Sequence, residues 1–194
     1  MRAVLDSEGV MKASEYSRLV GKEIAAALAE TDNQQIEKLL DMIQEADRVF
    51  VAGAGRSGFM MRAFAMRLMH LGLAAFVVGE STTPAIGVGD LLIAGSGSGQ
   101  TRITLATVEA AANRGARTAV ITAHPDSPIA LTCDHVVQLH TPITSVDKER
   151  PSRQPPGSLF EQVLLAQCDA TILMLMSRLG TTEEHMRQRH TKLE

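Results

Sequence analysis

The chain has 194 residues, of which 45% are hydrophobic, so it can bury one sizeable core and is too short for two ordinary domains. Its formal net charge of −3, from 19 basic and 22 acidic residues, excludes the broad positive field that concentrates nucleic acid around a protein. We therefore expect a local site for any anionic ligand and no nucleic-acid partner.

The cysteines and the apolar stretches predict a soluble protein. Cys133 and Cys168 have neither the number nor the spacing of a disulfide framework or a zinc site, so we expect two reduced, buried thiols and no metal. Residues 1–11 mix acidic residues with hydrophobic ones, unlike a signal peptide or a membrane anchor. The most apolar later stretch, 168–176, contains Asp169 and is too short to span a bilayer. We expect a cytoplasmic location and no membrane partner.

Hydrophobic periodicity predicts two amphipathic helices within about residues 14–46, the second beginning at a capping box formed by Thr31 and Gln34. Beyond residue 48 the pattern changes to short apolar strands separated by turns and helices. The predicted strands are 48–52, 75–78, 91–95, 118–122 and 135–139, and the predicted helices among them are 59–71 and 101–114. This alternation is typical of a parallel sheet that helices cover on both faces, joined by right-handed crossovers.

The last part of the chain begins with a proline-rich polar loop at 141–157, which is longer than a simple connector and of the kind that borders a binding site. A long apolar helix at 158–179 and a polar tail follow. We expect a single domain, 1–194, with N-terminal helices at about 14–46, an α/β core at about 48–140, and a C-terminal helix and tail at 158–194. The expected fold is α/β, a three-layer αβα arrangement with a five-stranded parallel sheet, flavodoxin-like or Rossmann-like.

A turn rich in serine and glycine lies between the third strand and the next helix. It consists of Ser96, Gly97, Ser98, Gly99, Gln100 and Thr101. Ligands of open α/β sheets bind outside the carboxyl ends of the strands. Close-lying backbone N–H groups, hydroxyl groups and a helix N-terminus can together hold a phosphate monoester there. The alternative is a flexible turn whose hydroxyl group only caps the helix.

A second glycine-rich turn, 53–58, follows the first strand. It matches the G-x-G-x-x-G fingerprint of dinucleotide-binding folds, and Glu80 stands after the next strand, as a ribose-binding acid would. A lone fingerprint of this kind is a weak signal. We interpret Arg56 and Ser57 as polar groups that face a small sugar phosphate.

The two turns together resemble the SIS sugar isomerase family, whose members pair a G-x-G-x-S turn with an S-x-S-G-x-T phosphate loop. Residues 79–85, Gly-Glu-Ser-Thr-Thr-Pro-Ala, further resemble the G-E-x-x-T-P-A loop of its 6-phospho-3-hexuloisomerase branch. The resemblance extends to the helix start at 158–161 and to Arg189 and His190, although the usual tail R-H-A-N-L-E is altered after the histidine. Arabinose 5-phosphate isomerases share the two loops but commonly carry a CBS pair, for which this chain has no room.

The resemblance implies an isomerase that interconverts 3-hexulose 6-phosphate and fructose 6-phosphate through a 2,3-enediolate, without a cofactor, in formaldehyde fixation or pentose phosphate supply. It assigns proton transfer to Glu161. It also implies a homotetramer or dimer of dimers, in which His190 reaches a neighbouring subunit's crevice as an acid or as a ring-opening group. Second-tier candidates for lining the crevice are Gly55, Glu80, Thr82 and Thr83.

Other interpretations stay open. By spacing alone, Ser158 and Glu161 form a capping box, and His190 is a solvated residue near a terminus. His70, in the last turn of its helix, fits the helix dipole. The rival functions are another sugar-phosphate isomerase such as arabinose 5-phosphate isomerase, a non-catalytic sugar-phosphate sensor like the SIS domains of DNA-binding regulators, and a dinucleotide-dependent oxidoreductase.

Overall fold

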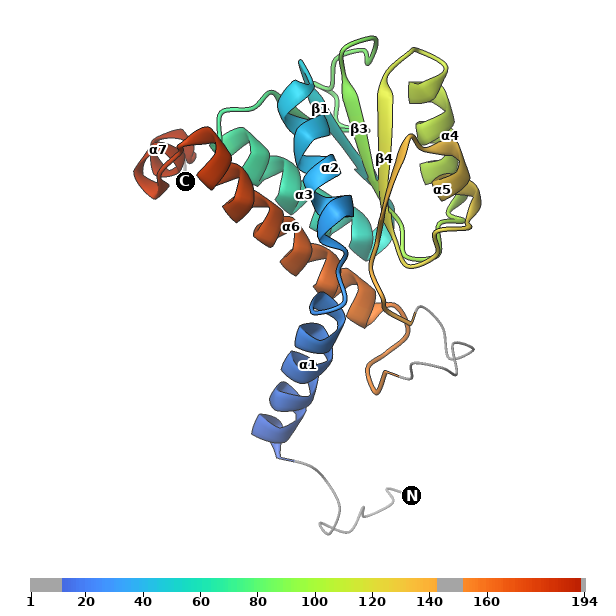
Figure 1. Ribbon diagram of the computed structural model, residues 1–194, viewed down its shortest axis with the longest axis vertical. Coiled ribbons are helices and arrows are strands. Elements are labelled where there is room, and N and C mark those ends of the chain that lie inside the picture. The colour runs from blue at the N-terminus through green and yellow to red at the C-terminus, as the bar shows by residue number, and fades with distance from the viewer. Residues whose placement is uncertain (1–11, 143–151, 193–194) are drawn as a thin grey trace.

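The computed structural model describes residues 12–142 and 152–192, and within these ranges five parallel strands form one sheet (Figure 1). The strands are β1 (Val49–Gly53), β2 (Ala75–Val77), β3 (Leu91–Gly95), β4 (Arg117–Thr122) and β5 (His135–Gln138). Their spatial order is β2-β1-β3-β4-β5, the flavodoxin-like order in which the winding reverses between β1 and β3. The predicted α/β fold is confirmed, and each strand end lies within one residue of its prediction.

Helices cover both faces of the sheet. They are α1 (Ala13–Leu28), α2 (Asn33–Glu45), α3 (Gly55–His70), α4 (Arg102–Ala112), α5 (Pro128–Thr132), α6 (Ser158–Leu179) and α7 (Glu183–Arg189). Helices α2, α3 and α6 lie on one face, and α4 and α5 lie on the other, while α1 projects away from the sheet (Figure 1). The predicted three layers are therefore present.

Strand alternation builds two cores, one on each face. In β3, Leu91 and Ile93 pack with α2, α3 and α6, whereas Leu92 and Ala94 pack with α4 and α5. All five residues of this central strand are buried. Because both faces are covered, the strand is apolar throughout rather than alternating with polar residues.

Helix α6 has the bounds that the sequence predicts. The sequence prediction considered only the apolar run 168–176, which is too short to span a bilayer. The whole helix is long and apolar enough to cross a membrane by length and composition alone. Half of the apolar window is buried inside the protein. Phe160, Leu164 and Leu175 lie in the core against α3 and the sheet, which is the packing of a core helix.

Helix starts account for most of the differences from the sequence predictions. The capping box at Thr31 is wrong, because Asp32 is the N-cap of α2 and its carboxylate accepts a hydrogen bond of 2.7 Å from the Gln34 N–H. A carboxylate one position later offers the same N-terminal cap. Helix α3 begins at Gly55 rather than at Phe59, so most of the predicted glycine-rich turn is its first turn.

Two short helices were not predicted. Helix α5 has five residues, too few for a periodic pattern, and Ser127 caps it. Helix α7 lies in the tail expected to be merely polar, where Thr182 forms its N-cap. Within the predicted loop 141–157, residues 143–151 lie outside the described part, as do 1–11 and 193–194 at the ends.

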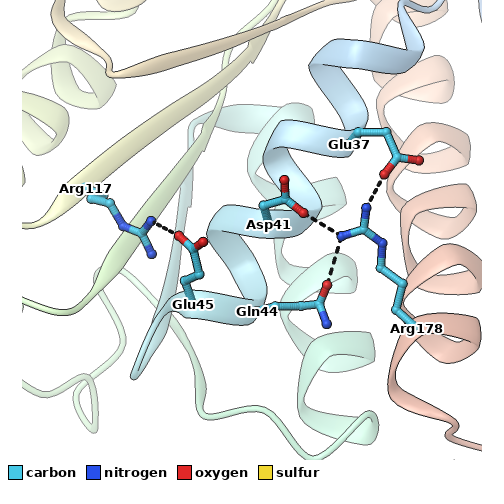
Figure 2. Close-up of polar contacts among 6 residues, drawn as sticks. All are labelled: Glu37, Asp41, Gln44, Glu45, Arg117 and Arg178. Atoms are coloured by element: carbon cyan, nitrogen blue, oxygen red, sulfur yellow. Dashed lines mark hydrogen bonds and ion pairs between the residues drawn. The ribbon is translucent and has the colours of Figure 1, made fainter.

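Polar contacts tie α2 to the rest of the fold (Figure 2). Near the end of α6, Arg178 contacts three α2 side chains, namely Glu37, Asp41 at 2.8 Å and Gln44 at 2.9 Å. Arg117, the first residue of β4, pairs with Glu45 at 2.7 Å. Because these groups are solvent-exposed they add little free energy, and their role is to orient α2 against α6 and β4.

Candidate active site

The two glycine-rich turns lie side by side at the carboxyl edge of the sheet. They follow β1 and β3, which are hydrogen-bonded neighbours whose last residues, Gly53 and Gly95, are register partners. This is the place where the winding reverses, and open α/β sheets bind ligands in the crevice there. A Cβ on Gly58 would lie 2.7 Å from the Gly53 carbonyl oxygen, so the first turn of α3 approaches β1 closely only because that residue is glycine.

The turn 96–101, after β3, is fixed by hydrogen bonds from the end of β4 and from α5. The Gly97 carbonyl accepts a hydrogen bond of 3.2 Å from the Ala123 N–H, and the Gly99 carbonyl accepts one of 3.1 Å from the Ile129 N–H. Gly99 has a φ of +61°, and a Cβ there would lie 1.8 Å from the Ser127 hydroxyl oxygen. The turn is therefore a fixed structure, and the alternative of a flexible turn does not describe it.

The exposed side of this turn presents hydrogen-bond donors at the start of α4. Thr101 is the N-cap, yet its hydroxyl lies 3.3 Å from the Ser96 hydroxyl and caps none of the described N–H groups of α4. Within the described residues, the N–H groups of Gly97, Ser98 and Thr101 also have no partner. Free N–H groups, hydroxyls and a helix N-terminus together suit a phosphate.

Glu161 lies in the first turn of α6, and its partner comes from the other glycine-rich turn. The carboxylate pairs with the Arg56 guanidinium; the Glu161 side chain is 14% exposed and the Arg56 side chain 62%. The capping-box interpretation is wrong. The N-cap of α6 is Gly157, and the Ser158 N–H donates to the Pro155 carbonyl at 3.0 Å.

The packing around Gly95 shows where Glu161 lies relative to the turn 96–101. A Cβ on Gly95 would lie 2.7 Å from the Met61 side chain of α3 and 3.2 Å from the Leu164 side chain of α6. Glu161 precedes Leu164 by about one helical turn, which rises about 5.4 Å. The start of α6 therefore lies just beyond the end of β3, at the same edge of the sheet as the turn 96–101, and Figure 1 shows α6 beginning at that edge.

In the loop after β2, the side chains of Glu80 and Thr83 make contacts with α3 and with the end of β2. Glu80 pairs with Arg62 of α3, and both side chains are about half exposed. The Thr83 hydroxyl donates a hydrogen bond of 2.5 Å to the Val77 carbonyl, while Thr82 is exposed. Of the polar second-tier candidates, Thr82 is thus the one whose side chain makes no hydrogen bond among the described residues. Gly55 is exposed at the start of α3.

His190 lies at the opposite end of the chain's own fold from Glu161. It ends α7, and its ring stacks on the His70 ring with centroids 5.2 Å apart. Between Glu161 and Leu179, α6 runs for about 27 Å at 1.5 Å per residue. The structure therefore does not bring His190 to Glu161 within one chain.

His70 is a buried titratable residue whose environment the sequence did not indicate. It is 2% exposed, and burial, together with the charges of Arg67 and His190, lowers its pKa. The dipole at the end of a helix raises the pKa of a histidine, whereas for His70 burial under α7 lowers it. Only knowledge of α7, 119 residues further along the chain, could have predicted it.

The two thiols and a groove beside α4 are further features of the described residues. Burial raises the pKa of the half-buried Cys133 to about 12 and that of the buried Cys168 further, as expected for inert thiols. A groove of about 350 Å³ between α4 and the sheet is lined mainly by apolar side chains such as Phe50 and Ile103. In the described ranges no cluster of three or more His, Cys, Asp or Glu residues suits a metal ion.

Comparison with known proteins gives consistent matches. The model of the SIS domain family matches residues 42–177. The 3-hexulose-6-phosphate isomerase of Mycobacterium gastri is 44% identical over 176 residues, which cover 91% of this chain and 88% of that enzyme. The enzyme of the same name from Bacillus subtilis is 40% identical over 185 residues, covering 95% and 100%.

Among solved structures, a Methanococcus jannaschii protein superposes with a TM-score of 0.81 at 32% identity. The match covers 93% of this chain and 99% of that one, for which a molecular function of 3-hexulose-6-phosphate isomerase has been inferred.

Proposed function

We propose a reaction on the premise that the chain belongs to the SIS domain family. In this proposal the protein interconverts 3-hexulose 6-phosphate and fructose 6-phosphate. The observation that carries this proposal is the pairing of the little-exposed Glu161 with Arg56 at the edge of the sheet where the turn 96–101 presents its free N–H groups. A base, a cation and an anion site then lie at one crevice. The relatives that bear this enzyme's name match over nearly the whole chain, which supports the same reaction.

The phosphate is held by the turn after β3. Ser96, Ser98, Gln100 and Thr101 supply side-chain or backbone donors, and Gly97 and Gly99 let the backbone approach the phosphate oxygens. Ser57 faces the same crevice from the first turn of α3. Anchoring the phosphate leaves the sugar carbons to be positioned against Glu161, and such positioning contributes up to about 7–11 kcal/mol of the barrier reduction in well-oriented reactions.

Glu161 is the proposed base. In 3-hexulose 6-phosphate the carbonyl is at C3, so the carboxylate removes the proton from C2 and the electron pair forms the 2,3-enediolate. The proton is then returned to C3 while the O2 proton passes to O3, directly or by exchange through solvent, so that the carbonyl forms at C2 and a hydroxyl at C3. The substrate carbons are oxidised and reduced within one molecule, so no external oxidant is needed. The adjacent Arg56 guanidinium suits the negative charge that develops on the enediolate oxygens.

His190 acts in trans in this proposal, in a homotetramer. Because α6 separates His190 from Glu161 within one chain, a catalytic His190 has to come from a neighbouring subunit. The projecting helix α1 and the apolar groove beside α4 offer surfaces for such an assembly. By analogy with the family we also propose a cytoplasmic enzyme of formaldehyde fixation or pentose phosphate supply, without a cofactor.

A coupled assay for fructose 6-phosphate tests the reaction. Wild-type protein is supplied with 3-hexulose 6-phosphate and, separately, with arabinose 5-phosphate. We expect turnover of the hexulose, and a fall in kcat of at least about 100-fold in Glu161→Gln because a general base is lost. The control is Glu45→Gln, which removes another carboxylate that pairs with an arginine, remote from the crevice.

Each other outcome points to a rival. Turnover of arabinose 5-phosphate alone would assign the related isomerase activity. Phosphate binding without turnover of either sugar would leave a sugar-phosphate sensor. Tight binding of NADH would favour the oxidoreductase.

A further inference from the structure

Helix α1 forms hydrogen bonds with the segment 152–154, which leads into α6. The Glu23 carboxylate of α1 accepts three hydrogen bonds from residues 152–154, which are about 130 positions away in sequence. The donors are the Ser152 hydroxyl at 2.7 Å, the Arg153 N–H at 3.1 Å and the Gln154 side-chain amide at 3.0 Å. Three donors on one carboxylate form a specific clamp rather than a chance surface contact.

The clamp requires an ionised carboxylate. Burial alone would raise the pKa of Glu23, but hydrogen bonds from Ser152, Gln154 and the Arg153 backbone, with the charge of Arg153, lower it. The ionised group accepts at both oxygens, whereas an amide at the same position accepts at one oxygen and turns a donor toward the other partners. A change of Glu23 to glutamine therefore loosens the clamp while keeping the shape of the side chain.

The chain between the clamp and Glu161 is stiff. Pro155 and Pro156 have fixed φ angles, and the Ser158 N–H donates to the Pro155 carbonyl at 3.0 Å. Gly157 then adopts a left-handed conformation, with φ at +81°, and its carbonyl accepts from the Glu161 N–H at 3.2 Å. A displacement of residues 152–154 is therefore passed to the first turn of α6.

The part of α1 that carries Glu23 is itself packed against the core. Ala27, one helical turn after Glu23, is buried in the same cluster as Leu159 and Phe160 of α6. Glu23 of α1 and Leu159 of α6 line the same groove of about 200 Å³. Glu23 thus stands on the part of α1 that is packed against the start of α6.

We propose that Glu23 is a positioning residue, which holds segment 152–157 and through it sets the Glu161 carboxylate opposite Arg56. This rests on the proposed role of Glu161 as the base. Because the turn after β3 holds the phosphate independently of α1, loosening the clamp lowers kcat and leaves KM nearly unchanged. Small misplacements of a reacting group lower rates by up to about 100-fold, so we expect a loss of kcat of about 10- to 100-fold.

The test compares Glu23→Gln with wild type. The matched control is Glu15→Gln, also on α1, whose carboxylate accepts from the Lys12 N–H within its own helix. Steady-state kinetics give kcat and KM, and amide hydrogen exchange of residues 152–160 reports the segment directly. We expect faster exchange and a lower kcat in Glu23→Gln only. Unchanged exchange with an unchanged kcat would overturn the proposal, as would an equal loss in Glu15→Gln.

A second set of variants keeps the test decisive if Glu23→Gln folds poorly. Ser152→Ala and Gln154→Ala remove the donors from the other side of the clamp. Each is expected to lower kcat on its own, and the double variant Ser152→Ala/Gln154→Ala is expected to lose clearly less than the product of the two single losses, because both residues belong to one contact with Glu23. Additive losses would overturn the clamp. If wild type itself turns over no sugar phosphate, the proposed function fails, while the exchange rates still decide whether Glu23 holds the segment.

Discussion

Gly99 is the residue that most constrains the shape of the turn 96–101, the proposed phosphate site. Its left-handed backbone and its contact with the Ser127 hydroxyl are requirements that no other residue type meets. The N–H groups of Gly97, Ser98 and Thr101 in the same turn have no partner among the described residues. The geometry of the proposed anion site therefore depends on a residue that contributes no side chain.

Replacing Gly99 by alanine tests this dependence. The left-handed conformation costs a non-glycine residue about 1–2 kcal/mol, and the clash with Ser127 adds about 1–3 kcal/mol. We expect the free energy of unfolding to fall by at least about 2 kcal/mol in urea titrations, with at least a tenfold loss of affinity for inorganic phosphate. Gly87→Ala is the control, because a Cβ there meets no described atom within 4 Å. Equal stabilities of the two variants would contradict the interpretation.

Glu161 shows the limit of reasoning from spacing at the residue scale. The S-x-x-E pattern is compatible with a capping box or with a base, and the capping box is excluded only by the pairing of Glu161 with Arg56, 105 residues earlier, and by the Gly157 N-cap. The same holds for Glu23, whose partners lie on a distant loop. Nothing in the local pattern of α1 predicts that contact, since Glu23 there is one acid among several on a helix.

At the scale of elements, the sequence predicts well what local patterns determine. The strands β1, β3 and β4 are short runs of mostly buried apolar residues and α6 is a long apolar run, so their bounds follow from composition. The start of α3 was misplaced because glycines at 55 and 58 look like a turn, although they allow the helix to begin close to β1. The strand order could not be read from sequence, because it depends on which strands pair across long connections.

Two leucines of α6 give a matched prediction. Leu175 is fully buried and Leu173 is 66% exposed. Leu175→Ala should lower the free energy of unfolding by about 2–5 kcal/mol, since it leaves a cavity in the core. Leu173→Ala should change it by less than about 0.5 kcal/mol at low protein concentration. Chemical denaturation of both variants checks this, and a large loss in Leu173→Ala would show that its side chain is covered in solution.

At the scale of the whole molecule, several surfaces make no contact within the described part of one chain. Helix α1 projects from the sheet, an apolar groove lies beside α4, and α7 holds His190 far from the chain's own Glu161. These three features have one explanation in the proposed homotetramer, in which neighbouring subunits complete each site.

Complementation between variants tests that assembly. Glu161→Gln and His190→Ala are each expected to form inactive oligomers, while co-expression of the two produces mixed oligomers. In those, about a quarter of the sites combine an intact Glu161 with an intact His190 from a neighbour, so activity should return to that level. A His190→Ala protein with full activity would contradict the role in trans, and so would mixed oligomers without activity.

The central claim is that Glu161 moves a proton through a 2,3-enediolate at the edge formed by β1 and β3. Incubation of fructose 6-phosphate with the protein in D₂O, followed by proton NMR, tests it most directly. We predict loss of the C3 proton signal with wild type, because each passage through the enediolate exposes that proton to exchange on the carboxylate, and retention of the signal with folded Glu161→Gln. Exchange at C1 instead of C3, or exchange in Glu161→Gln at the wild-type rate, would contradict the account.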